Sequence, residues 1–382
     1  MEPVMNETNE IYKLISAFLN RNETVEDKKK LINWFDQQSE NTIAKSDFEP
    51  IQQNARKRIL NHIQQTEKKF NSQLLLRYTG IAAALLLIGF SVLKLWPASE
   101  TLATAEQLAA VVPSKEKAII TLSSGKQIDL EELELNESIQ TGDVLIKKEA
   151  NGQICYHTIK DNTITVQQNS MYTPKGSTYD LTLSDGTMVT LNADSKITYP
   201  TSFGRGDREV ELQGEAYFHV RKTNNRSRFI VKSKGQQVVV LGTRFNVNAY
   251  SDNEKTQTTL EEGSVLVHLP NDSKSETYLK PNEQATLLQG KLHTSKINLE
   301  SVLGWKNGQF YFDGNNTEEV MQQIARWYNI EVVYKRDQRK EQYMGKIPRN
   351  LSLNKLIELL NYADLKTKAL TGKDAQITLI IT

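Results

Sequence analysis

One stretch of the chain carries no charged residue and interrupts an otherwise mixed hydrophobic and polar pattern. It runs from Tyr78 to Leu93, and the apolar residues 74–76 and 95–96 extend it on both sides. Sixteen helical residues span ~24 Å, and the flanks bring this length close to the roughly 30 Å hydrocarbon core of a bilayer. Because the stretch is apolar all round, the pattern predicts one transmembrane helix over residues 76–96 rather than a buried core helix.

The ends of this segment have the chemistry of membrane anchors. Basic side chains can reach the lipid headgroups, and aromatic side chains favour the interface. The four anchors that we expect are Arg77, Tyr78, Lys94 and Trp96. From Arg56 to Arg77 six basic residues face one acidic residue, whereas residues 97–112 contain no Lys or Arg. This bias predicts a cytoplasmic N-terminal part and an exported C-terminal part.

Before the apolar segment, hydrophobic positions recur with a helical period. One stripe spans residues 11–19, a second helix begins near Thr24, and a third is expected over about residues 47–65. We therefore expect a small all-α domain over residues 1–75. Residues 1–55 carry six basic and ten acidic side chains, a net charge of −4, which would suit a basic protein partner.

The apolar residues of these helices are candidate contacts for that partner. They are Leu14, Phe18, Leu31, Trp34 and Phe35. The alternative for Trp34 and Phe35 is that they only close the small helical bundle.

After an expected linker at residues 97–117, the hydrophobic period changes to two. A strand, a glycine turn and a second strand occur at residues 118–130 and again at residues 179–191. Further short strands follow at intervals of about ten residues. This pattern predicts an all-β domain over residues 118–300, either a sandwich or a short solenoid.

The last 80 residues mix both periods. A strand at residues 308–313 precedes a helix over Thr317–Tyr328, for which Asn316 and Glu319 form a capping box. Two strands, a helix capped by Ser352 or Asn354, and two more strands follow. The order βαββαββ predicts an α+β domain over residues 303–382. The whole chain is therefore expected to be multidomain, with an all-α, a transmembrane, an all-β and an α+β part.

Composition adds few positive signals. The chain has 47 basic and 46 acidic residues, so no overall field favours nucleic acid. The single cysteine, Cys155, excludes an intramolecular disulfide, and no metal-binding or phosphate-binding motif occurs. We expect no metal, no cofactor and no enzyme. Carboxylates such as Glu211, Glu215 and Glu261 would suit a glycosidase pair, but any β-domain carries such residues.

Five segments of the β-rich region form a recognisable series, in order: Met171–Gly176, Leu181–Ala193, Tyr199–Phe203, Arg208–Val220 and Val240–Val247. Together they resemble the FecR family of transmembrane anti-sigma factors. The segment Gly304–Phe312 is similar to the start of the C-terminal domain in FecR-type proteins of Bacteroidetes-like bacteria. That domain resembles the short N-terminal domain of secretins and TonB-dependent receptors.

The resemblance implies a regulator of transcription in the cell inner membrane. Its cytoplasmic helical domain would bind an extracytoplasmic-function (ECF) sigma factor, and its periplasmic domains would receive a signal from the signalling domain of a TonB-dependent outer-membrane transducer. An intramembrane or periplasmic protease would be a further partner, since a lone helix has no packing partner that could store two states. The alternative is a membrane-tethered periplasmic carbohydrate-binding or envelope-structural protein, which would not explain the acidic helical domain.

One peptide bond is a candidate for self-cleavage. Gly242–Thr243 lies where some FecR-type proteins are thought to cleave themselves. A threonine hydroxyl can attack the preceding carbonyl if the peptide is strained, and glycine leaves room for that attack. The alternative is a tight turn between two strands, which needs a small residue for the same steric reason.

Overall fold

The computed structural model describes residues 10, 13–17, 24–38, 101–113, 116–141, 144–158, 166–270, 272–335, 341–372 and 375–382. The chain divides into two compact units, residues 1–96 and residues 97–382. In the first unit the labelled helix is α2 (Val25–Gln38). Its N-terminus is capped reciprocally, because Asp27 accepts a hydrogen bond from the Thr24 N–H (2.9 Å) and the Asp27 N–H donates to Thr24 Oγ1 (3.2 Å).

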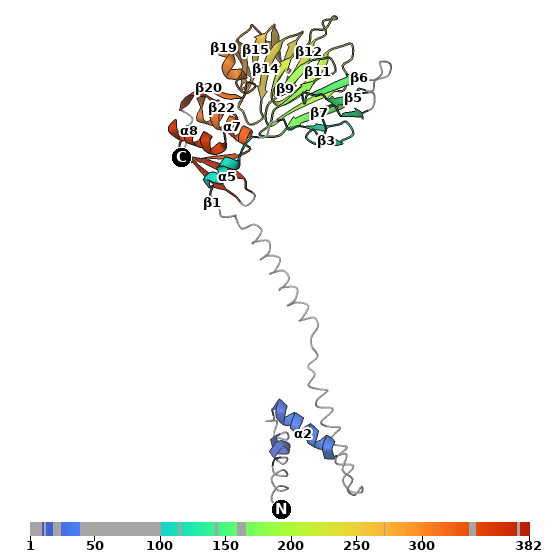
Figure 1. Ribbon diagram of the computed structural model, residues 1–382, viewed down its shortest axis with the longest axis vertical. Helices are drawn as coiled ribbons and strands as arrows, with labels where there is room; N and C mark the ends of the chain where they lie inside the picture. Colours follow the sequence, from blue (N-terminus) through green and yellow to red (C-terminus); the bar gives the residue numbers. More distant parts are fainter. Residues whose placement is uncertain are drawn as a thin grey trace, which may run out of the picture. The chain divides into compact units, whose positions relative to one another are not determined.

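Most of the second unit is a β-domain of two layers that share strand β11 (Arg208–His219). The first layer contains, besides part of β11, β2 (Ile119–Thr121), β3 (Gln127–Asp129), β7 (Gln168–Thr173), β10 (Ser195–Pro200), β12 (Phe229–Ser233), β13 (Gln236–Val240), β16 (Val265–Leu269) and β17 (Asp272–Leu279). The second contains β4 (Ser138–Thr141), β5 (Val144–Lys148), β6 (Ile154–Thr158), β8 (Tyr179–Thr182), β9 (Met188–Leu191), β14 (Arg244–Ala249), β15 (Lys255–Glu262), β18 (Glu283–Leu288) and β19 (Lys291–Lys296). Their inward-facing side chains form one hydrophobic core, over which the strands fan out in Figure 1.

Strand β11 changes layers at Gly214. Before this residue β11 pairs with β10 and β12, and from Gly214 onward it pairs with β9 and β14. Gly214 has a φ of +94°, and a Cβ atom there would lie 2.7 Å from the Cα of Ser195. Only glycine fits this position, because the backbone conformation and the close approach of β10 both exclude a side chain.

The turn between β8 and β9 is fixed by a buried ion pair. Asp185 accepts hydrogen bonds from the N–H and the hydroxyl of Thr187 and pairs with Arg208 of β11 at 2.5 Å. The hairpin β2–β3 has the same turn geometry, with φ of +83° at both Gly125 and Gly186. The two hairpins that share a sequence pattern therefore also share a turn conformation.

The C-terminal module packs helices against two small sheets. Its elements are α6 (Leu299–Leu303), β20 (Gln309–Asn316), α7 (Thr317–Tyr328), β21 (Glu331–Tyr334), β22 (Gln342–Pro348), α8 (Leu353–Tyr362), β23 (Thr367–Thr371) and β24 (Ile377–Ile381). One sheet pairs β20 with β22, and the other has the order β1-β23-β24-β21. Helix α7 begins with the capping box of Asn316 and Glu319 and ends at Asn329, whose φ of 51° is left-handed.

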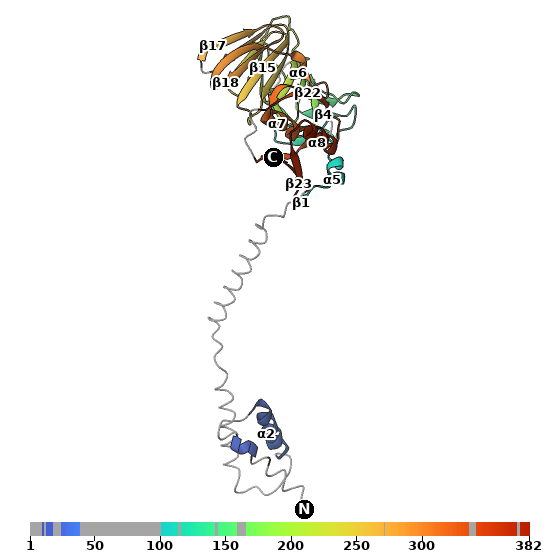
Figure 2. The ribbon, with the colours of Figure 1, turned by 90° about the vertical axis from the view of Figure 1, so that its left-hand side faces the viewer.

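Part of the expected linker belongs to this C-terminal module. Strand β1 (Thr101–Leu102) pairs with β23, and helix α5 (Ala105–Ala110) packs against α8. Figures 1 and 2 both place β1 and α5 beside the C-terminal elements. Leu108 of α5 is buried in the module's hydrophobic core. The β-domain is thus inserted between β1–α5 and the rest of the module.

The predicted fold class needs correction. The described structure is mainly β, and no helix among the described residues is long and apolar enough to cross a membrane. An all-α N-terminal bundle and a transmembrane helix are therefore not part of the fold that the structure shows; residues 39–100, with the expected transmembrane segment, lie outside the described residues. The prediction relied on the local period of apolar residues, which does not show whether a helix finds a packing partner.

Candidate functional site

The β-domain and the C-terminal module meet at a buried carboxylate, that of Glu215. Glu215 follows Gly214 on β11, and its side chain is buried. Its Oε2 accepts a hydrogen bond from Asn192 Nδ2 (2.7 Å), and its Oε1 accepts one from Asn246 Nδ2 (2.9 Å). Burial raises the pKa of Glu215, while these two hydrogen bonds act in the opposite direction.

The same two asparagines connect Glu215 to the C-terminal module. The Oδ1 of Asn192 accepts a hydrogen bond from Arg349 Nη1 (3.1 Å), and the Oδ1 of Asn246 accepts one from Trp305 Nε1 (3.3 Å). Each amide therefore donates to Glu215 and accepts from the module. We call Arg349, Asn192, Glu215, Asn246 and Trp305 the Glu215 network. Because both ends of each amide are used, the network fixes how the two parts meet.

Arg349 supplies the positive charge of this network and is deeply buried. It follows β22, is 3% exposed, and its guanidinium lies 4.8 Å from the ring centroids of both Phe310 and Trp327. Burial lowers its pKa to about 10, whereas the negative charge of Glu215 raises it. The two aromatic rings thus hold a buried positive charge that faces Glu215 across Asn192.

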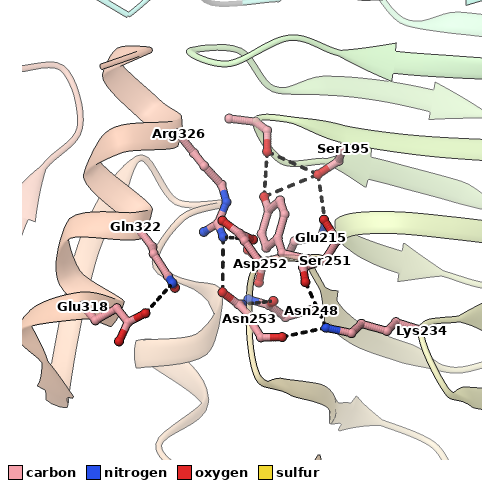
Figure 3. Close-up of polar contacts among 12 residues, drawn as sticks. Ser195, Glu215, Lys234, Asn248, Ser251, Asp252, Asn253, Glu318, Gln322 and Arg326 are labelled. Atoms are coloured by element: carbon pink, nitrogen blue, oxygen red, sulfur yellow. Dashed lines mark hydrogen bonds and ion pairs between the residues drawn. The ribbon is translucent and has the colours of Figure 1, made fainter. Parts of the chain in front are cut away.

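A second arginine joins helix α7 to the loop between β14 and β15. Figure 3 shows Arg326 extending from α7 to this loop, where its Nη2 donates to Asp252 Oδ1 (2.6 Å) and Asn253 Oδ1 (3.2 Å). Its guanidinium also lies 3.8 Å from the ring centroid of Tyr250. Lys234 holds the loop from the other side through the carbonyls of Ser251 and Asn253.

Two polar cavities open at this junction. Their volumes are about 320 and 450 Å³, and both are lined by Glu215, Lys255 and Glu319. The ion pair between Lys255 Nζ and Glu319 Oε1 (2.5 Å) joins β15 to α7 at the shared wall. The lining consists mainly of carboxamide and charged side chains, and the described residues contain no cluster that could hold a metal ion. A lining of carboxamide and charged side chains is suited to a polar interface between two domains of one protein.

The expected self-cleavage site lies between β13 and β14. Thr243 is buried, and its hydroxyl donates to the carbonyl of Ser264 at 3.0 Å. A Cβ atom at Gly242 would lie 2.0 Å from Lys222 Cγ, and one at Gly263 would lie 2.9 Å from Thr243 Oγ1. A side chain at Gly242 would therefore collide with Lys222 in the folded state, and both self-cleavage and the tight turn stay predictions.

The other predicted residues do not gather into one described site. In the first unit Leu14 is half-buried and Leu31 is buried. Trp34 and Phe35 lie on α2, but their side chains are outside the described residues, as are Phe18 and the expected anchors Arg77, Tyr78, Lys94 and Trp96. Their roles stay predictions.

The Glu215 network was not found from the sequence. Of its members only Glu215 was singled out, as one of several carboxylates of the β-domain. A usable signal in the sequence was the end of the polar and apolar alternation after Gln213, at Gly214–Phe218, where the structure buries five successive residues including Glu215.

Comparison with known proteins finds two family matches, which together contain four of the five residues of this network. The family described as FecR protein matches residues 169–266, and the family described as FecR, C-terminal, matches residues 309–378. The first range contains Asn192, Glu215 and Asn246, and the second contains Arg349. No curated protein matches the chain.

Two solved structures are similar to this chain. Two crystal structures of a candidate anti-sigma factor from Parabacteroides distasonis, at 2.50 and 1.65 Å resolution, match with 29% sequence identity and a TM-score of 0.50. Each match covers 56% of this chain and 99% of the other. The relative's whole crystallised chain is therefore similar to a little over half of this one.

Proposed function

Because the chain belongs to the FecR family of anti-sigma factors, we propose that it binds an ECF sigma factor in the cytoplasm and controls its access to RNA polymerase. The observation that carries this proposal is the joint presence of both FecR-type domains, in order, in one unit tied together by the Glu215 network. No catalytic role is needed for such a regulator, since it acts by binding.

We assign sigma-factor binding to residues 1–75. This part carries a net charge of −4 over residues 1–55, which favours a basic protein surface. The candidate contacts are Leu14, Phe18, Leu31, Trp34 and Phe35. The burial of Leu31 suggests that it supports the fold of α2, so the exposed neighbour Ile32 is the better contact to test.

We further propose that the chain crosses the inner membrane once, with its N-terminus in the cytoplasm and its FecR domains in the periplasm. The uncharged residues 78–93 and the excess of basic residues just before them support this orientation. On the periplasmic side, the partner would be the signalling domain of a TonB-dependent outer-membrane transducer. The C-terminal module is the part that would meet it, because its βαββαββ order is that of the related receptor domain.

Co-purification tests the proposal directly. The tagged full chain is co-expressed with each ECF-type sigma factor of its host, and complexes are isolated from solubilised membranes. We expect one sigma factor to co-purify stoichiometrically, and to be lost from a chain without residues 1–75. An Ile32→Asp variant should weaken the complex at least tenfold, whereas Lys29→Asp on the same helix should not, because it increases the acidic character. Retention of the sigma factor by the shortened chain would overturn the proposal.

A further inference from the structure

The turns at one end of the β-domain form a basic surface. Buried Arg208 holds several of these turns together, because its guanidinium pairs with Asp185 and donates to the carbonyls of Arg221 (3.0 Å) and Ser227 (3.0 Å). We call the four segments that meet here the basic end: residues 183–187, 201–208, 221–228 and 241–243. They contain six basic and two acidic residues, a net charge of +4.

Two cations of the basic end lie against glycines. A Cβ atom at Gly186 would lie 2.9 Å from Arg221 Nη1, and one at Gly242 would lie 2.0 Å from Lys222 Cγ. The absence of a side chain at each glycine therefore makes room for a basic side chain. Four cations of the basic end are exposed and form no ion pair with another described residue: Arg205, Arg221, Lys222 and Arg226. Their charge is available to a partner.

The rest of the second unit is acidic. Residues 97–382 carry 34 basic (47 − 13) and 35 acidic (46 − 11) side chains, a net charge of −1, so the residues outside the basic end carry −5 (−1 − 4). Much of this charge is concentrated in residues 129–137, which we call the acidic loop and which contain five acidic and no basic residues. One of the five, Glu131, pairs with Lys117 (2.7 Å).

The acidic loop has a fixed shape. Lys148 Nζ donates to the carbonyls of Leu130 (2.6 Å) and Leu133 (2.8 Å), and both leucine side chains are buried. Glu132 and Glu134 are exposed, and their side chains form no hydrogen bond or ion pair with another described residue. The loop therefore presents carboxylates to solvent from a backbone that is held in place.

The two charged surfaces are separated within one molecule. Pairing from β10 through β7 and β2 to β3 connects Lys196 with Asp129, the first residue of the acidic loop. Pro200, where β10 enters the basic end, lies four residues farther along β10. This places Asp129 and Pro200 ~13 Å apart along the strands and ~14 Å apart across them. The acidic loop thus leaves the cations of its own basic end unpaired.

We propose that the basic end of one copy of this chain docks on the acidic loop of a second copy. The occupant is a second copy because the chain itself carries the complementary surface, at a position that it does not use within one molecule. Each surface also has an exposed leucine, Leu241 (49% exposed) in the basic end and Leu135 (56% exposed) in the acidic loop. The leucines add apolar contact area, and the opposite charges select the partner and the register.

The two surfaces differ, so the contact is heterologous and joins copies head to tail. A second copy leaves one basic end and one acidic loop free, and further copies can add in the same way. The contact lies within the second unit and does not depend on sigma-factor binding.

Charge reversal at each surface tests the proposal. The basic-end variant carries Arg221→Glu and Arg226→Glu, and the acidic-loop variant carries Glu132→Lys and Glu134→Lys. Full chains with two different tags are co-expressed, and the fraction that co-isolates through one tag is measured in detergent at low ionic strength. We expect the wild-type chain to co-isolate with itself and each variant to co-isolate with itself at least about fivefold less. Added salt should weaken the wild-type association.

Mixing the two variants gives the decisive result. Their reversed surfaces are complementary to each other, so co-expression of one variant with the other should restore co-isolation to about the wild-type level. The matched control is Lys355→Glu with Lys368→Glu, two exposed lysines of the C-terminal module, which should leave self-association unchanged. Urea denaturation confirms that both variants fold. A wild-type chain that does not co-isolate with itself, variants that still do, or a mixture that fails to recover would each overturn the proposal. Failure of the mixture alone would indicate a different charged protein as the partner.

Discussion

Arg349 and Glu215 lie on opposite sides of Asn192, whose amide accepts a hydrogen bond from the arginine and donates one to the carboxylate. The two charged residues come from different FecR-type domains, 134 positions apart in the chain (349 − 215). A buried charge is stable only when it is compensated nearby. Each domain therefore supplies the opposite charge that compensates the buried charge of the other. This favours a single arrangement of the two domains.

Replacing Arg349 by methionine should weaken this junction strongly. The change removes one of the two donors to Asn192 Oδ1, the other being the Ala193 N–H, and it takes a buried opposing charge away from Glu215. We therefore expect the free energy of unfolding of the second unit to fall by roughly 2–4 kcal/mol. Lys346→Met on β22 is the control. Lys346 is exposed and contacts Glu300 in an ion pair and the ring of Tyr311, so its loss should leave the unfolding curve nearly unchanged. Urea denaturation measures both. An equal loss in the two variants would contradict a special role for Arg349.

Glu215 should make stability depend on pH. Its folded-state pKa is raised by burial above the ordinary 4.5, so protonation is favoured in the folded state. This contribution is fully present below about pH 4.5 and is lost as the pH rises through the raised pKa. The stability of the wild type relative to Glu215→Gln, which cannot titrate, should therefore decrease above pH 4.5.

The matched control is Glu211→Gln on the exposed face of the same strand. The stability of the Glu211→Gln variant should show the same pH dependence as that of the wild type, because the Glu211 side chain is exposed to solvent in the folded as well as in the unfolded state. Denaturant curves between pH 4 and pH 8 give the three profiles. A constant difference between the wild type and Glu215→Gln would show that Glu215 does not titrate in this range.

Local sequence signals predicted elements better than they predicted contacts. The bounds of α7 and the capping box at Asn316 and Glu319 were predicted correctly, because both depend on residues within one or two turns. The role of residues 101–111 was missed, since β1 pairs with residues 270 positions later (371 − 101). A two-residue strand also has no period that a pattern could reveal.

The Glu215 network was missed for a related physical reason. Its members Asn192, Glu215, Asn246, Trp305 and Arg349 are brought together by the crossing of β11 between layers and by the docking of the C-terminal module. Neither event leaves a local spacing in the sequence. The predicted fold class contained too much helix for a different reason. A strong local period predicts a helix, but it does not show whether that helix packs against anything.

Gly214 should be indispensable to the crossing of β11. Gly214→Ala places a methyl group 2.5–2.8 Å from Ser195 and requires an L-residue at a φ of +94°. We expect a loss of about 3 kcal/mol or more in the free energy of unfolding. Gly125→Ala separates the two causes: its φ of +83° is similar, but no atom lies within 4 Å of the added Cβ, so a loss of only about 1 kcal/mol is expected. Equal losses would mean that backbone conformation alone explains the requirement.

Thr243 allows a direct test of the two explanations for the Gly242–Thr243 pair. The hydroxyl donates to Ser264 O, and Gly242 lies where a side chain would collide with Lys222. We therefore expect Thr243→Ala to lower the free energy of unfolding by about 1 kcal/mol through the lost hydrogen bond, and blots of the full chain to show one intact band for the wild type and the variant. Thr243→Ser, which keeps the hydroxyl, should restore most of that stability. Wild-type fragments ending at residue 242 that persist in Thr243→Ser and vanish in Thr243→Ala would instead establish attack by the hydroxyl on the preceding carbonyl.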